Sequence, residues 1–250
     1  MTGVVVLGMH RSGTSLVSQL TGRLGAVFCR PDDLLCGTEQ GRHTSYWESR
    51  SLVLFNESLL RAFGGDWAKP PALAPDWESS PLAEGLAPRG RQLFWELHPP
   101  TGWAWKDPRL SLTLPFWLTW VLSDARAVLV VRHPAEVAAS LERRDGIGAE
   151  HALWLWHRYM ASAVLACRDT PTLVMSYARL CQDPLATGES LRRWISPAAV
   201  PDEAVVRAAV ADVRNGPVAA GAPGPRPAPE AMALYDALER MHGRRLEVSA

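Results

Sequence analysis

Short apolar runs alternate with amphipathic stretches along most of this chain. Four runs are apolar at nearly every position, and their lengths predict buried strands: Val4–Leu7, Trp103–Lys106, Ala127–Val131 and Thr172–Met175. The stretches between them carry apolar residues at helical spacing. Strands that are apolar throughout and alternate with helices are typical of a parallel sheet covered on both faces. We therefore expect an α/β fold with a central parallel sheet flanked by helices.

The helical spacing and its stop signals set the expected boundaries. Residues 64–90 are rich in Gly and Pro and predict a surface loop or lid, and residues 215–229 predict a second irregular segment. Cys29–Arg42 is also predicted to be irregular. The expected helices are Thr14–Leu24, Thr44 or Ser45 to Phe63, Arg89–His98, Leu110–Leu122, Ala135–Arg143 with Pro134 in its first turn, Glu150–Arg168, Glu189–Ile195, Glu203–Arg214 and Glu230–His242.

Composition narrows the class of protein. The 250 residues suit one domain, and the 26 acidic and 26 basic residues create no overall field that would attract nucleic acid or an anionic membrane. The basic residues are arginines except for Lys69 and Lys106, and this Ala-, Arg- and Pro-rich composition suggests a bacterial source. No apolar run approaches the roughly 18–20 residues of a membrane span, so no membrane-spanning segment is expected. No basic segment precedes the first apolar run, so we do not expect a signal peptide there. The four cysteines match no zinc or redox spacing, so we expect reduced thiols in a cytoplasmic protein. No oligomer interface is indicated.

The stretch VVVLGMHRSGTS, residues 4–15, reads as a buried strand, a tight turn and a helix start. Backbone N–H groups and the positive end of the helix dipole make such a turn an anion site. Its two glycines have the spacing of an ATP-binding phosphate loop, but Thr14 stands where that loop has a lysine. Arg132, not an Mg²⁺-binding Asp, follows the strand AVLVV. The turn is therefore suited to an anion but poorly suited to a magnesium triphosphate.

Polar clusters follow each predicted strand, and ligands of parallel sheets bind beyond the carboxyl ends of the strands. We expect the clusters to converge on one crevice: Gly8–Ser15, Lys106–Arg109, Arg132–Ser140 and Ser176-Tyr177. Ser140 lies eight residues after Arg132, about 9 Å along the predicted helix from its first turn. Arg132 and Ser140 together could hold a second phosphate, distinct from the anion held by the turn.

Taken together, these segments resemble the sulfotransferase superfamily. RSGTS is similar to the family's loop for the 5′-phosphosulfate of 3′-phosphoadenosine 5′-phosphosulfate (PAPS), and VVRHPAEVAASL to its 3′-phosphate site. VMSYARLCQDP resembles the segment whose Tyr reaches the adenine, and WKDPRLSLTLPFW a segment of bacterial and carbohydrate-type members. The resemblance implies a P-loop-like sulfotransferase fold and PAPS as donor, with PAP as product. The implied donor contacts are His10, Arg11, Ser12, Gly13, Thr14, Ser15, Arg132, Ser140, Tyr177 and, from a faint match at Arg214-Asn215-Gly216, Arg214.

The catalytic base is less clear from the sequence. Cytosolic members place a His two residues after a Lys that resembles Lys106, but Pro108 occupies that position here. The candidates are Glu48, Asp107, His43 and His10. Relatives with a carboxylate base place a Glu on the helix after the first strand–helix unit, which favours Glu48. Asp107 could instead pair with Arg109 or cap the next helix. We expect Lys106 and Arg11 to contact the sulfuryl group or the bridging oxygen. Leu16 stands where relatives often place an adenine-stacking Trp.

The expected function is therefore metal-independent in-line transfer of a sulfuryl group from PAPS to a hydroxyl of a small-molecule, sugar or lipid acceptor. Two alternatives remain at this point. One is a phosphate-loop nucleotide kinase or hydrolase with an unusual loop, which would need an Mg²⁺ ligand pair and a lysine in reach of the phosphates. The other is a catalytically inactive nucleotide-binding module.

Overall fold

The chain forms a four-stranded parallel sheet in the order β4-β1-β5-β6. In this computed structural model the described residues are 3–39, 42–97, 102–196, 202–211, 213 and 225–246. The strands are β1 (Gly3–Leu7), β4 (Ala104–Lys106), β5 (Ala125–Val131) and β6 (Thr172–Ser176). β1 pairs in parallel with both β4 and β5, and β5 pairs with β6. The expected central parallel sheet is thus confirmed, and its strands all end at the same edge.

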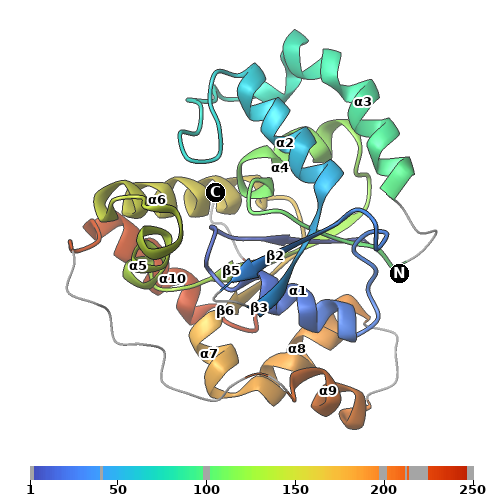
Figure 1. Cartoon of the computed structure of the whole chain (residues 1–250), viewed down its shortest axis with the longest axis vertical. Coiled ribbons are helices and arrows are strands. Elements are labelled where there is room, and N and C mark those ends of the chain that lie inside the picture. Colours follow the sequence, from blue (N-terminus) through green and yellow to red (C-terminus); the bar gives the residue numbers. More distant parts are fainter. Residues whose placement is uncertain are drawn as a thin grey trace.

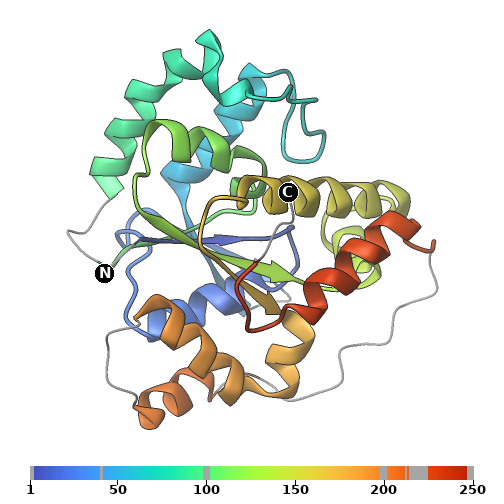
Figure 2. The same cartoon turned by 180° about the vertical axis from the view of Figure 1, so that it is seen from behind.

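Helices cover both faces of this sheet (Figures 1 and 2). Alternate strand residues enter two cores: Val5 and Leu7 of β1 point into one, whereas Val4 and Val6 point into the other. The first core is closed by α2 (Arg50–Ala62), α3 (Pro81–Leu97), α4 (Leu110–Trp120), α5 (Pro134–Asp145), α6 (Ala149–Ala166) and α10 (Pro229–Arg240). The second core is closed by α1 (Thr14–Arg23), α7 (Tyr177–Gln182), α8 (Pro184–Ile195) and α9 (Glu203–Val210).

A β-hairpin replaces part of the predicted loop and helix before α2. β2 (Leu34–Glu39) pairs antiparallel with β3 (Arg42–Ser49), so Cys29–Arg42 is not irregular throughout and the helix does not begin at Thr44 or Ser45. The cap of α2 is Ser49, whose Oγ accepts a hydrogen bond from Leu52 N at 3.1 Å. Both predictions were wrong because cross-strand pairing outweighs the local capping signal. Glu48 consequently lies near the end of a strand, not on a helix.

The predicted loop at residues 64–90 is also only partly correct. Residues 64–76 are irregular, but the short 3₁₀ helix η1 (Trp77–Ser79) follows, and α3 begins at Pro81 instead of near Arg89. Pro88 lies inside α3, which buries Ala83, Ala87 and Leu93 against the core. Burial of this face therefore outweighs the Gly and Pro content on which the loop prediction rested.

The irregular segment 64–76 is held against α6. Tyr159 Oη donates to Trp67 O at 2.8 Å, Arg158 Nη2 donates to Pro71 O at 3.1 Å, and the His151 Nε2 lies 2.7 Å from Ala68 O. Three side chains from one helix thus fix the backbone of this segment beside the carboxyl edge of the sheet.

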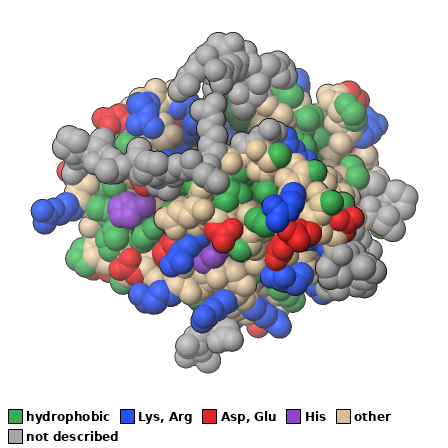
Figure 3. Space-filling view, turned by 90° about the horizontal axis from the view of Figure 1, so that it is seen from below, with side chains coloured by type: hydrophobic (Ala, Val, Ile, Leu, Met, Phe, Trp, Pro, Cys, Tyr) green, Lys and Arg blue, Asp and Glu red, His purple; other side chains and the backbone are tan. Residues whose placement is uncertain are grey.

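Acidic and basic side chains are interspersed on the face of the molecule shown in Figure 3, in keeping with the balanced composition. The four cysteines, all within the described residues, are unpaired. In the described part of the chain no helix has the length and apolar character that crossing a membrane requires. Most of the expected irregular segment at 215–229 lies outside the described residues.

Candidate active site

The loop after β1 is shaped by three residues with positive φ, which are Gly8, Arg11 and Gly13. Gly8 has φ 141°, and a Cβ there would stand 2.6 Å from the carbonyl oxygen of Val130. Gly8 N donates to Ser111 Oγ at 3.0 Å, which ties the loop to α4. Arg11 is left-handed with φ 67°, a strained backbone conformation for a residue with a side chain. The loop is therefore held in one specific conformation at the carboxyl edge of the sheet.

Gly13 closes this loop and caps α1 without a side-chain hydrogen bond. Its φ is 91°, and a Cβ at this position would lie 2.3 Å from Cδ2 of Tyr177. Tyr177, the first residue of α7, therefore packs directly against the backbone of the loop. Gly13, Thr14 and Ser15 line a cleft together with Tyr177, so the N-terminus of α1 faces that cleft.

The cleft has a volume of about 250 Å³ and is lined by side chains from the carboxyl ends of several strands and from the segments that follow them. Arg11 comes from the loop after β1, Glu48 from β3, Lys106 from β4 and Arg132 from the end of β5. The expected convergence of polar clusters on one crevice is thus confirmed. The remaining lining residues are His10, Gly13, Thr14, Ser15, Leu16, Tyr46, Pro108, Arg144 and Tyr177.

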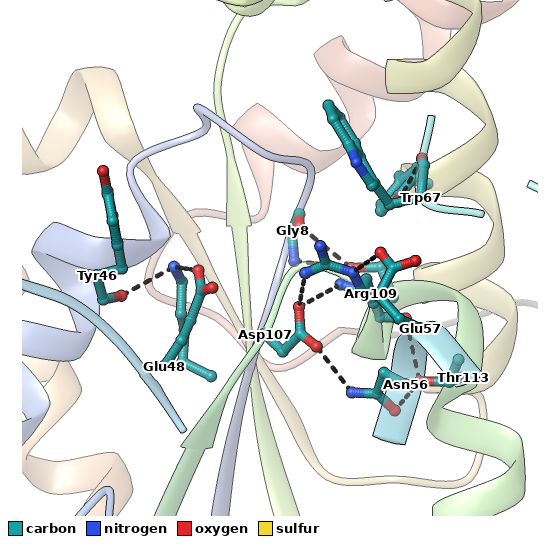
Figure 4. A network of polar contacts seen from close by, with 12 residues as sticks. Gly8, Tyr46, Glu48, Asn56, Glu57, Trp67, Asp107, Arg109 and Thr113 are labelled. Carbon is teal, nitrogen blue, oxygen red and sulfur yellow. Dashed lines mark hydrogen bonds and ion pairs between the residues drawn. The ribbon is translucent and has the colours of Figure 1, made fainter. Parts of the chain in front are cut away.

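Lys106 connects three elements at the floor of the cleft. Its side chain is 3% exposed, and Nζ donates to Ser15 Oγ at 3.2 Å and to Tyr46 O at 3.0 Å. Nζ also forms an ion pair with the carboxylate of Glu48 (Figure 4). An ammonium group has three donors, and these contacts use all of them. Glu48 itself stays accessible from the cleft, with 13% of its side chain exposed.

A second polar group joins the loop to α5. Arg11 Nε donates to Ser140 Oγ at 3.0 Å, and Arg132 Nη1 donates to Arg11 O at 3.1 Å. The guanidinium of Arg132 also lies over the ring of Tyr177, 4.4 Å from its centroid, and pairs with Glu136. Burial raises the pKa of Tyr177, so its hydroxyl stays protonated at neutral pH. Arg132, Ser140 and Tyr177 are thereby tied to the same loop.

His10 is buried beside the cleft and its Nε2 has no hydrogen-bond partner among the described residues. Its ring packs at 4.6 Å on Trp67 and at 5.7 Å on Tyr159. Burial, followed by the positive charges of Arg109 and Lys106, lowers the pKa of His10 well below its usual value. The imidazole is therefore neutral at pH 7.

Asp107 does not line the cleft and belongs to a buried network beside it (Figure 4). Its carboxylate is completely buried, accepting from Asn56 Nδ2 at 2.9 Å and from Arg109 Nη1 at 2.9 Å. Arg109 pairs in addition with Glu57. Burial alone would lower the pKa of Arg109, but the charges of Asp107 and Glu57 raise it overall. This is the pairing with Arg109 that was the alternative to a catalytic role, and Asp107 lies outside the lining of the cleft.

Other predicted contacts have different outcomes. Ser12 is fully buried, does not line the cleft, and its Oγ has no partner within the described residues. Ser140 reaches the cleft only through Arg11. Arg214 and the side chain of His43 lie outside the described residues.

Sequence reasoning missed Tyr46 and Arg144, which both line the cleft. Tyr46 was missed because its segment was read as a helix, when it lies on β3. Arg144 is four residues after Ser140 on α5, so helical spacing from Ser140 was the signal that could have found it.

The fold is similar to that of two solved sulfotransferase structures. A sulfotransferase domain from the curacin biosynthetic pathway superposes with a TM-score of 0.56 and 15% identity, covering 96% of this chain and 98% of that domain. The sulfotransferase STF9 from Mycobacterium avium superposes with a TM-score of 0.52 and 16% identity, covering 99% of this chain and 78% of STF9. No protein-family model and no curated protein matches the sequence. The chain therefore has the sulfotransferase fold, as its motifs led us to expect.

Proposed function

We propose that this protein is a sulfotransferase that transfers a sulfuryl group from PAPS to a hydroxyl of a small-molecule, sugar or lipid acceptor in the bacterial cytoplasm. The observation that carries the proposal is the junction of two anion-binding groups. Arg11 bonds Ser140 through its side chain and Arg132 through its carbonyl, so the loop after β1 and the start of α5 share one cleft. A donor with phosphate groups at both its 5′ and 3′ positions requires both.

The residues present fit such a donor. The N-terminus of α1 and the side chains of Lys106 and Arg11 offer positive charge to a 5′-phosphosulfate. Arg132 and Ser140 both bond Arg11, and Tyr177, which lies under the Arg132 guanidinium and lines the cleft, is assigned to the nucleoside. The set that we assign to the donor is Arg11, Ser12, Gly13, Thr14, Ser15, Arg132, Ser140, Tyr177 and Arg214, and His10 is left out of it.

The chemistry needs a proton acceptor and a charge stabiliser. We assign the first role to Glu48, which accepts the proton of the acceptor hydroxyl as the new O–S bond forms. The S–O bond to the 5′-phosphate breaks in the same in-line step, and its electron pair stays on the departing phosphate oxygen. Lys106 and Arg11 stabilise the negative charge that develops there. The products are the sulfated acceptor and PAP.

The Lys106–Glu48 pair links these two roles. Because Lys106 uses its three donors on Ser15, Tyr46 and Glu48, it must release one of them to contact the donor. Release of Glu48 leaves a carboxylate without its counter-ion at the floor of the cleft, where it can accept a proton. Donor binding therefore prepares the base.

Calorimetric titration with PAP and, separately, with Mg·ATP tests the proposal. We expect tight, metal-independent binding of PAP, and a preference for Mg·ATP would favour a kinase or hydrolase and refute the proposal. Arg132→Ala should weaken PAP binding roughly 10- to 100-fold, because it removes a charge-assisted contact worth about 1.5–3 kcal/mol. Arg143→Ala, on the exposed side of the same helix, is the matched control and should leave PAP affinity unchanged.

Glu48→Gln tests the catalytic assignment separately. This variant should bind PAP nearly as well as the parent protein but lose turnover with PAPS. Glu142→Gln, an exposed carboxylate on α5, should retain both properties. Unchanged turnover in Glu48→Gln would remove Glu48 from the mechanism and leave His10 as the base in the cleft.

A further inference from the structure

One end of the cleft has cationic and polar groups that the donor assignment leaves without a clear role. Arg144 lines the cleft, and so does His10, whose buried Nε2 has no partner among the described residues. Arg144 Nε donates to both carboxylate oxygens of Asp145, at 3.0 and 2.8 Å. The two Nη groups carry the other four donors of the guanidinium. About a third of the Arg144 side chain is exposed, so a ligand can reach it.

The geometry of α5 places Arg144 away from the nucleoside. Arg132 lies just before Pro134, the first residue of α5, and stacks on Tyr177. Arg144 lies ten residues after Pro134, a rise of about 15 Å along the axis of α5, and one turn beyond Ser140. The cleft therefore has two separate arginines: Arg132 lies near Tyr177, and Arg144 lies further along α5.

His10 lines the same cleft as Arg144. The positive charge of Arg144 is near enough to contribute, after burial and the charges of Arg109 and Lys106, to the lowered pKa of that histidine. His10 is neutral, its ring packs on Trp67 and Tyr159, and in the tautomer with a proton on Nε2 that nitrogen, which has no partner among the described residues, is a hydrogen-bond donor. A guanidinium and a neutral imidazole donor together suit an anionic oxygen group.

We propose that Arg144 and His10 form a subsite for an anionic group of the acceptor, so that the acceptor is a hydroxylated compound that also carries a carboxylate or a phosphate. This inference rests on the proposed function, because it assigns to the acceptor the part of the cleft that the donor does not occupy. The anionic group anchors the acceptor at the Arg144 end, and its hydroxyl is directed toward Glu48 and Lys106.

Calorimetry on the PAP-loaded protein tests the subsite. The probes are 4-hydroxybenzoate and 3-hydroxybutyrate, each compared with its methyl ester, and 4-hydroxyphenyl phosphate to separate the two anion types. We expect the anions to bind at least tenfold more tightly than the esters. In Arg144→Gln this preference should be lost, while PAP affinity stays within twofold of the parent. The matched variant Arg143→Gln removes the same charge from the exposed side of α5 and should keep the preference.

Three results would overturn the subsite. In the first, the esters bind as tightly as the anions. In the second, the anions do not bind at all. In the third, Arg144→Gln loses as much affinity for PAP as it loses for the anions. The last result would assign Arg144 to the donor. Failure of PAP to bind the parent protein would instead refute the proposed function. The anion–ester comparison would then be made on the protein without PAP, where the same preference and the same loss in Arg144→Gln are expected.

Discussion

Asp107→Asn separates a structural carboxylate from a catalytic one. Asp107 is fully buried and neutralises Arg109, whose side chain is only 11% exposed. The substitution removes the negative charge but keeps the shape. It also turns one oxygen into an NH₂ group, so the new amide cannot accept from both Asn56 Nδ2 and Arg109 Nη1. Asn56 cannot rotate in compensation, because its Oδ1 already accepts from Thr113 and Trp117.

The structure sets the size of the effect. Removing one partner of a buried ion pair costs about 3–5 kcal/mol, and Glu57 still compensates part of the Arg109 charge, so we expect about 3 kcal/mol. At about 2–4 °C per kcal/mol for a chain of this size, Tm should fall by roughly 6–12 °C. Urea denaturation gives the free energy of unfolding directly. At a temperature where the variant stays folded, PAP affinity and turnover should be close to those of the parent protein.

Glu48→Gln is the contrasting variant. It exchanges a partly exposed carboxylate for an amide of the same shape and should change stability by less than Asp107→Asn while abolishing turnover. The opposite pattern, a stable but inactive Asp107→Asn together with an active Glu48→Gln, would refute our separation of these carboxylates. It would make Asp107 the proton acceptor despite its burial.

Three further measurements test other parts of the structure. Gly13→Ala forces a Cβ against Tyr177 at a positive φ, and calorimetry should show PAP binding weakened by about tenfold, from roughly 1–3 kcal/mol of strain. Burial lowers the pKa values of His10 and His242, so the unfolded chain binds protons more readily than the folded protein. The free energy of unfolding, measured by urea titration, should therefore fall as the pH drops below about 6.5 and recover above it. In His242→Asn this dependence on pH should be less steep. Ser49→Ala removes the observed cap of α2 and should cost about 1 kcal/mol in the same assay, whereas no loss would contradict that helix start.

The sheet could be predicted from the sequence because its strands are buried on both faces. Val4–Leu7 and Ala127–Val131 are apolar at every position, and β1 and β5 are found there with ends differing by one or two residues. The position of the motifs after these strands could then be predicted as well, because parallel strands bring their carboxyl ends to the same edge of the sheet. Arg11 and Arg132 could therefore be assigned to one cleft without any knowledge of distances.

The hairpin and α3 could not be predicted in the same way. β3 contains His43, Ser45 and Glu48, residues with no alternating apolar pattern, and its pairing with β2 depends on a partner several residues away. The irregular segment 64–76 and the start of α3 at Pro81 depend on burial against the core, which local Gly and Pro content does not report. The β3 strand of the hairpin contributes Tyr46 and Glu48 to the cleft, so a part of the fold that the sequence did not predict supplies the proposed base.

Lys106 connects the composition of the chain to the chemistry of the cleft. This chain uses arginine almost everywhere, yet it has a lysine at the end of β4. The structure supplies a reason, because Nζ donates in three separate directions, to Ser15 Oγ, to Tyr46 O and to Glu48. A planar guanidinium could not satisfy three acceptors arranged around one point, whereas a compact ammonium can. In the proposed mechanism the same compact charge exchanges one of these acceptors for a phosphate oxygen of the donor. At this position the departure from arginine therefore suits the proposed coupling between donor binding and release of the base.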